Sequence, residues 1–310
     1  MTMRAKNTTH LRFSLLLATL YTLGPLTVAL ATQLTSGEYA VTQSWSQETE
    51  FERPYYVRVP TNAKREKLPV FIFLHGNGGN AKGSMNQSMK RYPTISSRYV
   101  MVFAQGYKKS WNIVSERSKA DDLGFIETII RHLATYDNVQ PDSFSIMGVS
   151  NGSALVNQLA IECKLPNIRN YVSSVSPLNL FQHDGENFRA KGDDNNYQTP
   201  VIPATGKRLM NISGTEDRLI PYQGGPSERI PAKDGKLGFV GAEKSIYLWA
   251  KQMGEKGPKL KTPSRIEGNL ELFSYLTGAV IHYKVVDQGH GATRAITEKI
   301  LLSFLEATNQ

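Results

Sequence analysis

The stretch Ser143–Ala160, SFSIMGVSNGSALVNQLA, joins an apolar run to an amphipathic run through a turn of small residues. Ser143–Met147 is apolar enough for a buried strand, and the residues after the turn repeat at helical spacing. Ser150 stands on the turn in the pentapeptide GVSNG. So sharp a turn needs neighbours without side chains, and Gly148 and Gly152 meet that need. The stretch predicts a strand, a tight turn and a helix, with Ser150 as a candidate nucleophile at the helix N-terminus.

The rest of the chain repeats this alternation of strand-like and helix-like segments. Apolar runs predict strands at Tyr55–Val59, Pro69–Leu74, Val100–Ala104, Ser143–Met147, Tyr171–Val175, Leu209–Ile212 and Ala279–Val286. Helical spacing predicts helices within 118–136, after Ser150, and within 241–253 and 292–307. Two polar stretches, Asn179–Lys207 and Tyr222–Gly238, predict long loops. The pattern predicts an α/β fold with a mostly parallel central sheet and helices on both faces.

The N-terminus has the composition of a secretory signal peptide. Basic residues without acidic partners precede an apolar run, Phe13–Ala31, which ends in the small-residue pattern Ala-Leu-Ala. We expect cleavage after Ala31, which leaves one catalytic domain over 32–310 and a secreted, extracellular or periplasmic protein. The alternative is an uncleaved membrane anchor. No later segment is apolar for long enough to span a bilayer, so no membrane association is expected after cleavage.

Charge and cysteine content narrow the classes of function. The chain has 310 residues and a net charge of +9, but its basic residues are spread out, so nucleic-acid binding is not expected. A single cysteine, Cys163, excludes an intramolecular disulfide and is predicted to be a buried thiol. Asp121 and Asp122 are interpreted as helix N-terminal residues rather than metal ligands. No metal and no cofactor are predicted.

A glycine-rich segment, His75-Gly-Asn-Gly-Gly79, follows the predicted strand Pro69–Leu74. Glycines let backbone N–H groups approach a substrate oxygen closely. In a serine hydrolase, one oxyanion donor is the N–H of the residue after the nucleophile and the other comes from such a loop. We therefore predict the N–H groups of Asn151 and Asn77 as oxyanion donors. A plain glycine-rich turn is the alternative, and the Lys-Ser/Thr of a phosphate-binding loop is missing.

A base and an acid follow in later loops. Asp217 follows the predicted strand Leu209–Ile212 and is the candidate acid, with Glu216 as competitor. His290 follows the last predicted strand between two glycines and is the candidate base, with His282 as the weaker alternative. The chain order Ser150, Asp217, His290 is the order of α/β-hydrolases.

Several segments carry a resemblance to a known family. They are RPYYVRVP, LPVFIFLHGNGGN, WNIVSERSKADDLGFIETII, GVSNGSALVNQLA, GTEDRLIPYQGG, YLWAKQMG and the closing GHGAT, which span Arg53 to the C-terminus. The chain resembles the secreted esterases that include polyhydroxybutyrate depolymerases and feruloyl esterases, within the α/β-hydrolase fold. The resemblance implies Ser150 as nucleophile, Asp217 as acid, His290 as base and an oxyanion loop around Asn77. Two departures leave the substrate open: Ala292 stands where the family often has tryptophan, and the family's paired cysteines are missing.

These residues predict an exported serine esterase with a small or oligomeric ester as substrate. The candidate esters are hydroxyalkanoate oligomers, feruloyl or acetyl groups on polysaccharides, and short-chain esters. Trp111 and Tyr222 are candidates for lining the substrate site, with core packing as the alternative. A serine peptidase or amidase on the same fold is the second hypothesis, because a triad does not distinguish esters from amides. A non-catalytic binding module is the third.

Overall fold

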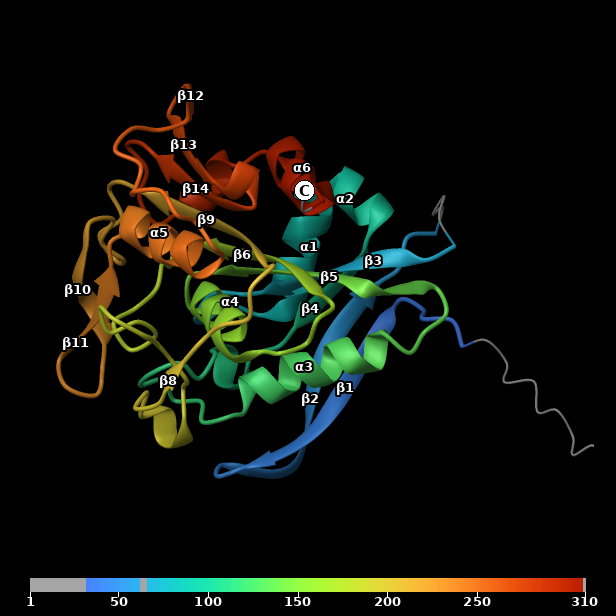
Figure 1. Cartoon of the computed structure of the whole chain (residues 1–310). Helices are drawn as coiled ribbons and strands as arrows, with labels where there is room; N and C mark the ends of the chain where they lie inside the picture. Colours follow the sequence, from blue (N-terminus) through green and yellow to red (C-terminus); the bar gives the residue numbers. More distant parts are fainter. Residues whose placement is uncertain (1–31, 62–65, 309–310) are drawn as a thin grey trace, which may run out of the picture. The chain divides into compact units, whose positions relative to one another are not determined.

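A computed structural model describes residues 32–61 and 66–308 (Figure 1). The predicted signal peptide, residues 1–31, lies outside the described residues, so the boundary at Ala31 and the division into leader and catalytic domain stay predictions. Within the described ranges, no helix combines the length and the apolar character that a membrane crossing requires.

Within the described residues, ten strands form one sheet in the order β1-β2-β4-β3-β5-β6-β9-β14-β13-β12. Their bounds are Gly37–Trp45 (β1), Glu48–Arg58 (β2), Leu68–Leu74 (β3), Val100–Ala104 (β4), Val139–Val149 (β5), Ile168–Ser174 (β6), Arg208–Gly214 (β9), Arg265–Glu267 (β12), Leu270–Tyr275 (β13) and Val280–Val285 (β14). Strands from β4 to β14 run parallel, and antiparallel strands extend the sheet at both edges. The predicted mostly parallel sheet is confirmed.

Helices cover both faces of this sheet, as predicted (Figure 1). Their bounds are Ala81–Arg91 (α1), Pro93–Arg98 (α2), Asp122–Leu133 (α3), Asn151–Glu162 (α4), Ala242–Gln252 (α5) and Glu298–Glu306 (α6), with short 3₁₀ turns at Tyr107–Lys109 (η1), Asp193–Asn195 (η2), Leu276–Gly278 (η3) and Ala292–Ala295 (η4). One apolar cluster joins α3, α4 and α5 to the sheet, and a second joins α1, α2 and α6 to it. Burial of such faces is the main stabilising term of the fold.

The structure differs from the sequence-based prediction in several elements. Strands β1, β12 and β13 and helix α2 were not predicted. Tyr222–Gly238 was predicted as a loop, but most of it lies in the antiparallel hairpin of β10 (Gly224–Pro231) and β11 (Lys236–Val240). A smaller pair, β7 (Phe188–Arg189) and β8 (Pro200–Val201), lies within the other predicted loop. Helix α1 was not predicted, because its sequence AKGSMNQSMKR has too few apolar residues to show helical spacing.

Two details concern residues singled out in the sequence. Asp121 caps α3 by accepting a hydrogen bond from the Gly124 N–H, whereas Asp122 is buried against Arg53. The Cys163 side chain is buried beyond the end of α4, and burial raises the pKa of its thiol to about 12. Because the thiolate is the reactive form, this cysteine is inert at neutral pH.

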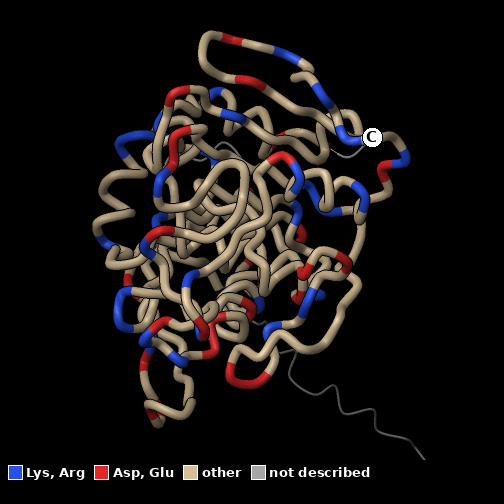
Figure 2. The backbone as a smooth tube through the Cα atoms, turned by 90° about the vertical axis from the view of Figure 1, so that its left-hand side faces the viewer, with Lys and Arg blue, Asp and Glu red and all other residues tan. Residues whose placement is uncertain are grey.

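The charged residues of the described chain are distributed over many loops and helices. In the view of Figure 2, basic and acidic positions lie interspersed along the backbone and do not separate into one basic and one acidic side. This matches the spread of the charges along the sequence.

Candidate active site

Ser150 lies on the turn between β5 and α4, at the carboxyl edge of the parallel strands. Its backbone has φ 56° and ψ −119°, a strained conformation for a residue with a side chain, at a cost of about 1–3 kcal/mol. A Cβ on Gly148 would lie 2.2 Å from the Gly152 carbonyl oxygen, and one on Gly152 would lie 2.4 Å from the Leu74 oxygen. The two glycines are therefore required for the turn to form.

The structure brings Ser150, His290 and Asp217 together. The Ser150 Oγ lies 2.9 Å from His290 Nε2, and His290 Nδ1 lies 2.7 Å from Asp217 Oδ2. Because an ionised carboxylate only accepts hydrogen bonds, Nδ1 carries the proton and Nε2 is left to accept the serine hydroxyl proton. The Asp217 side chain is 2% exposed and that of His290 is 32% exposed. The imidazole can thus reach a bound molecule while its carboxylate partner is shielded.

Asp217 is fixed by its own turn. Its Oδ1 accepts hydrogen bonds from the N–H groups of Leu219 and Ile220, at 2.9 and 3.0 Å. These bonds leave Oδ2 aimed at the imidazole. Glu216, the predicted competitor, is exposed, and its backbone N–H donates to the Gln288 carbonyl oxygen at 2.9 Å, while its carboxylate makes no hydrogen bond to another described residue.

The loop after β9 that carries Asp217 (the acid loop) packs directly on the loop after β14 that carries His290 (the histidine loop). The Asp287 N–H donates to Thr215 Oγ1 at 2.9 Å, next to the bond between Glu216 and Gln288. A Cβ on Gly214 would lie 2.1 Å from the Gln288 carbonyl oxygen, so a side chain at this position would separate the loops. The register of Asp217 against His290 therefore depends on backbone contacts between the two loops.

A second set of contacts holds the far side of the histidine loop. Thr293 Oγ1 lies 2.6 Å from Ser174 Oγ, and the Ser174 carbonyl oxygen accepts the Ser150 N–H at 2.9 Å. Arg91 of α1 donates from Nη2 to the carbonyl oxygens of Thr293 and Ile296, at 2.9 and 3.0 Å. Ser174 thus touches both the serine turn and the histidine loop. Nothing in the sequence pattern distinguishes Ser174, Thr293 or Arg91 from surface polar residues.

The predicted oxyanion donors lie beside the serine turn. A Cβ on Gly76 would lie 3.5 Å from Ser150 Cβ, which shows how closely the glycine-rich loop approaches the serine. In the part of the chain that the structure describes, the backbone N–H groups of Asn77 and Asn151 donate to no protein atom. Two unpaired N–H groups, one of them at the first residue of α4, suit an oxygen that gains negative charge.

The side chain of Asn151 has a structural task that the sequence did not reveal. Its Oδ1 accepts the Trp111 N–H at 2.7 Å, and its Nδ2 donates to the Trp111 carbonyl and to Glu116 Oε1. The other carboxylate oxygen of Glu116 accepts the N–H groups of Ile113 and Val114. Burial raises the pKa of Glu116. The amide of Asn151 therefore ties the start of α4 to the segment that follows η1.

The predicted substrate-lining role of Trp111 and Tyr222 does not fit their positions. Trp111 is fully buried and donates its indole N–H to the His75 carbonyl oxygen at 2.7 Å. Tyr222 is also buried, and its hydroxyl lies 2.9 Å from His282 Nε2. Both rings belong to the core because each has its polar atom paired inside the protein.

Two other histidines near the sheet are structural. His75 accepts the Gly106 N–H at Nε2, so its Nδ1 carries the proton and donates to the Gly76 carbonyl oxygen. Burial lowers the pKa of His75. His282 is fully buried within β14, and burial lowers its pKa from 6.5 to about 3. Both imidazoles are neutral at pH 7, and their hydrogen-bond partners among the described residues do not include Ser150.

The sequence comparison gives an esterase relative. The chain is 24% identical over 236 residues to feruloyl esterase B of Piromyces equi, which covers 74% of this chain and 40% of the relative. The chain thus matches less than half the length of that protein. No protein-family model matches the chain.

Solved structures show the same fold. The chain superposes on an acetyl xylan esterase from Aspergillus awamori with a TM-score of 0.58 and 12% identity, over 87% of this chain and 98% of that one. A thermostable esterase gives a TM-score of 0.52 and 14% identity, over 88% of this chain and 63% of that chain. The protein has the α/β-hydrolase fold. The resemblance to esterases of this fold that the sequence motifs indicated is confirmed.

Proposed function

We propose that this protein is an exported serine esterase that hydrolyses carboxylic esters through Ser150, His290 and Asp217. The observation that carries the proposal is the unbroken hydrogen-bond chain from the Ser150 hydroxyl through His290 to a buried carboxylate. Support also comes from the strained conformation of Ser150, because such strain persists mostly at functional sites.

The chemistry follows from the positions of the protons. Ser150 attacks the ester carbonyl while His290 Nε2 takes its proton, and Asp217 stabilises the imidazolium that forms. The N–H groups of Asn77 and Asn151 stabilise the negative oxygen of the tetrahedral intermediate. His290 then gives the proton to the leaving alcohol, and water activated by the same imidazole releases the acid from the acyl-enzyme.

The proposal also concerns which acyl group the enzyme removes from its ester substrate. The relative named feruloyl esterase B makes feruloyl esters the first substrate class to test, and acetyl groups on polysaccharides, hydroxyalkanoate oligomers and short-chain esters follow. Export rests on the predicted signal peptide at 1–31. N-terminal sequencing of protein recovered outside the cell should begin at Thr32.

One set of assays tests the reaction class. Purified protein is given p-nitrophenyl acetate, methyl ferulate, acetylated xylan, hydroxybutyrate oligomers and a peptide p-nitroanilide, beside the matched variants Ser150→Ala and Ser303→Ala. Ser303 is exposed on α6, and its hydroxyl makes no hydrogen bond to another described residue, so its variant is the control for loss of a serine hydroxyl away from the triad. We expect ester turnover that Ser150→Ala abolishes and Ser303→Ala keeps. Faster p-nitroanilide than ester turnover would make the protein an amidase, and no turnover by folded protein would make it a binding module.

A further inference from the structure

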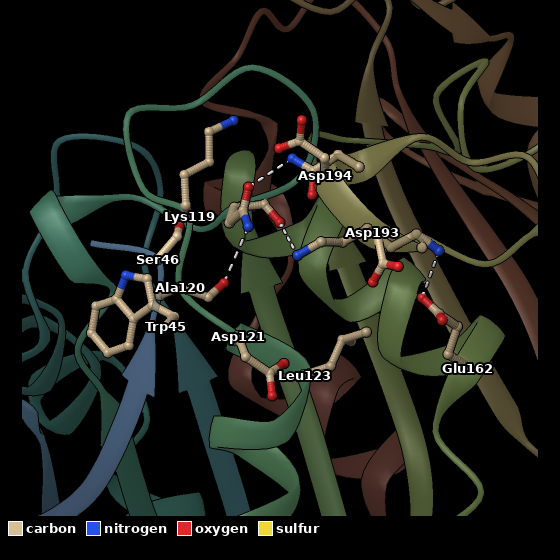
Figure 3. Close-up of a pocket in the computed structure, with 13 residues that line it drawn as sticks. Trp45, Ser46, Lys119, Ala120, Asp121, Leu123, Glu162, Asp193 and Asp194 are labelled. Atoms are coloured by element: carbon tan, nitrogen blue, oxygen red, sulfur yellow. Dashed lines mark hydrogen bonds between the residues drawn. The ribbon is translucent and has the colours of Figure 1, made fainter. Parts of the chain in front are cut away.

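A cavity of about 480 Å³ lies beside the segment that follows η1, between the end of β1 and the turn η2 (Figure 3). Its floor consists of buried residues, among them Asn112, Lys191 and Asn195. Figure 3 shows the Trp45 ring on one side and Glu162 on the opposite side. The volume is in the range of small-molecule sites, about 300–1,000 Å³. None of the residues that line this cavity takes part in the reaction proposed above.

The floor of the cavity is rigid. Lys191, which is 9% exposed, donates from Nζ to the Asn112 carbonyl oxygen at 2.8 Å. Asn195 donates from Nδ2 to Asn112 Oδ1 at 2.7 Å and to the Val114 carbonyl oxygen at 3.0 Å. An ammonium group has three N–H donors, and this one has a single hydrogen-bond acceptor among the described residues. Both N–H groups of the Asn195 amide are used in these bonds, so the donor in the floor with capacity for a further partner is the Lys191 ammonium.

The wall and rim add acceptors and one aromatic ring. Asp193 and Asp194 are exposed on η2, and their carboxylates make no hydrogen bond to another described residue. The Trp45 ring is held in place by edge contacts with Phe51 and Tyr107, at centroid distances of 5.6 and 4.9 Å. A preformed ring loses little conformational freedom when a ligand packs against it.

The charged and hydrogen-bonding side chains that line the cavity limit which class of ligand can bind there. A free anion would meet more carboxylates than cations, since Asp121, Glu162, Asp193 and Asp194 outnumber Lys119 and Lys191. A cation would meet the ammonium group in the floor. Within the described residues, no group of three or more His, Cys, Asp and Glu side chains is placed to hold a metal ion. A neutral ligand with many hydroxyl groups can donate to the carboxylates, accept from the lysine, and lay an apolar ring face on tryptophan.

We propose that this cavity binds a neutral carbohydrate chain, with sugar hydroxyls on Lys191 and Asp193 and a sugar ring against Trp45. The site goes beyond the proposed ester hydrolysis, because it needs no ester and no triad. It is connected to the active site by one short segment: Trp111 bonds to the Asn151 side chain, and the next residue, Asn112, forms the floor. A carbohydrate bound here rests on the segment that anchors the start of α4.

Calorimetric titration of the full mature chain tests binding without reference to catalysis. The probes are xylohexaose, cellohexaose and maltohexaose, which contain no ester. The variants are Trp45→Ala and Asp193→Ala, with Asp234→Ala as the matched control, because Asp234 is exposed on the turn between β10 and β11. We expect saturable one-to-one binding of at least one hexasaccharide. Trp45→Ala should weaken it more than about tenfold.

Asp193→Ala is the variant that cannot be dismissed as a folding defect, because the Asp193 side chain is exposed and makes no hydrogen bond to another described residue. We expect it to weaken binding about tenfold, as for a lost hydrogen bond to a charged group, and Asp234→Ala to leave the Kd unchanged. Failure of all three hexasaccharides to bind, or binding that Asp193→Ala and Trp45→Ala leave intact, would overturn the proposal. So would saturable binding of spermidine at the cavity with no binding of a sugar.

Discussion

The protein contains two trios of hydroxyl, imidazole and side-chain oxygen that look alike in geometry and differ in chemistry. In the first, His290 lies between Ser150 and Asp217, at 2.9 and 2.7 Å. In the second, His282 lies between Tyr222 and Asn211, at 2.9 and 2.8 Å. In both trios Nε2 faces the hydroxyl and Nδ1 faces the oxygen.

Two differences separate the trios. Asp217 is a carboxylate and can stabilise an imidazolium, whereas the amide of Asn211 cannot. His290 is partly exposed beyond the end of β14, whereas His282 is fully buried within it. Burial lowers the pKa of His282 to about 3, so this ring does not accept a proton at neutral pH. Distances alone therefore do not define an active site; access and a buried counter-charge do.

The largest expected effect comes from removing each imidazole in turn. His290→Ala should lower kcat for p-nitrophenyl acetate by about 10⁶-fold, as loss of the base does in triad enzymes. His282→Gln should leave kcat within about threefold, because that ring transfers no proton in the proposed reaction. Steady-state kinetics on folded protein, verified by circular dichroism, measures both. Equal losses of kcat in the two variants would contradict the assignment of different roles to the two trios.

The second-largest expected effect tests whether the reaction needs the negative charge of Asp217 beside His290. Asp217→Asn converts the first trio into a copy of the second and should lower kcat by about 10⁴-fold, because an amide can stabilise the wrong imidazole tautomer. Glu216→Gln is the matched control on the adjacent exposed residue, and it should keep wild-type kcat. A larger loss in Glu216→Gln than in Asp217→Asn would transfer the acid role to Glu216.

The third effect concerns stability in acid. Between pH 3 and 6.5 the unfolded chain protonates His282 but the folded chain does not, so the free energy of unfolding falls as the pH falls through this window. The contribution is up to about 1.4 kcal/mol per pH unit, and above pH 6.5 the ring adds no pH dependence. Urea denaturation of the parent and His282→Gln at pH 4, 5, 6 and 7 measures it. The parent should show the steeper loss toward acid, and parallel curves would contradict the assigned pKa.

The smallest effect concerns the loop that carries His290. Thr293→Val removes the hydroxyl that meets Ser174 and should lower kcat about fivefold while KM stays unchanged, because the imidazole is less well aimed. Thr293→Ser keeps the hydroxyl and should restore kcat. Equal kcat values for the Val and Ser variants would show that packing, and not the hydroxyl, positions the loop.

The sequence was most informative where local geometry leaves few choices. Gly148 and Gly152 flank Ser150 because any side chain there would clash with backbone atoms, and so the turn is visible in a pentapeptide. The core strands are visible because burial on both faces demands continuous apolar runs. These two signals predicted the fold and placed Ser150, Asp217 and His290 in loops at one edge of the sheet.

What the sequence did not predict depends on contacts between distant segments. An aromatic residue in a polar stretch, such as Trp111 or Tyr222, has the same local pattern whether it lines a cleft or pairs its polar atom in the core. The link between Ser174 and Thr293 joins residues 119 positions apart. Helix α1 is held by caps and by packing at a few positions, without an apolar face that a single sequence reveals.

The central claim is that Ser150 is the nucleophile that His290 activates. Treatment of the purified chain with a fluorophosphonate, followed by intact-mass and peptide mapping, tests it most directly. We predict one adduct per chain, located on Ser150, absent in Ser150→Ala and strongly slowed in His290→Ala but not in His282→Gln. An adduct on another serine, or undiminished labelling of Ser150→Ala, would contradict the account.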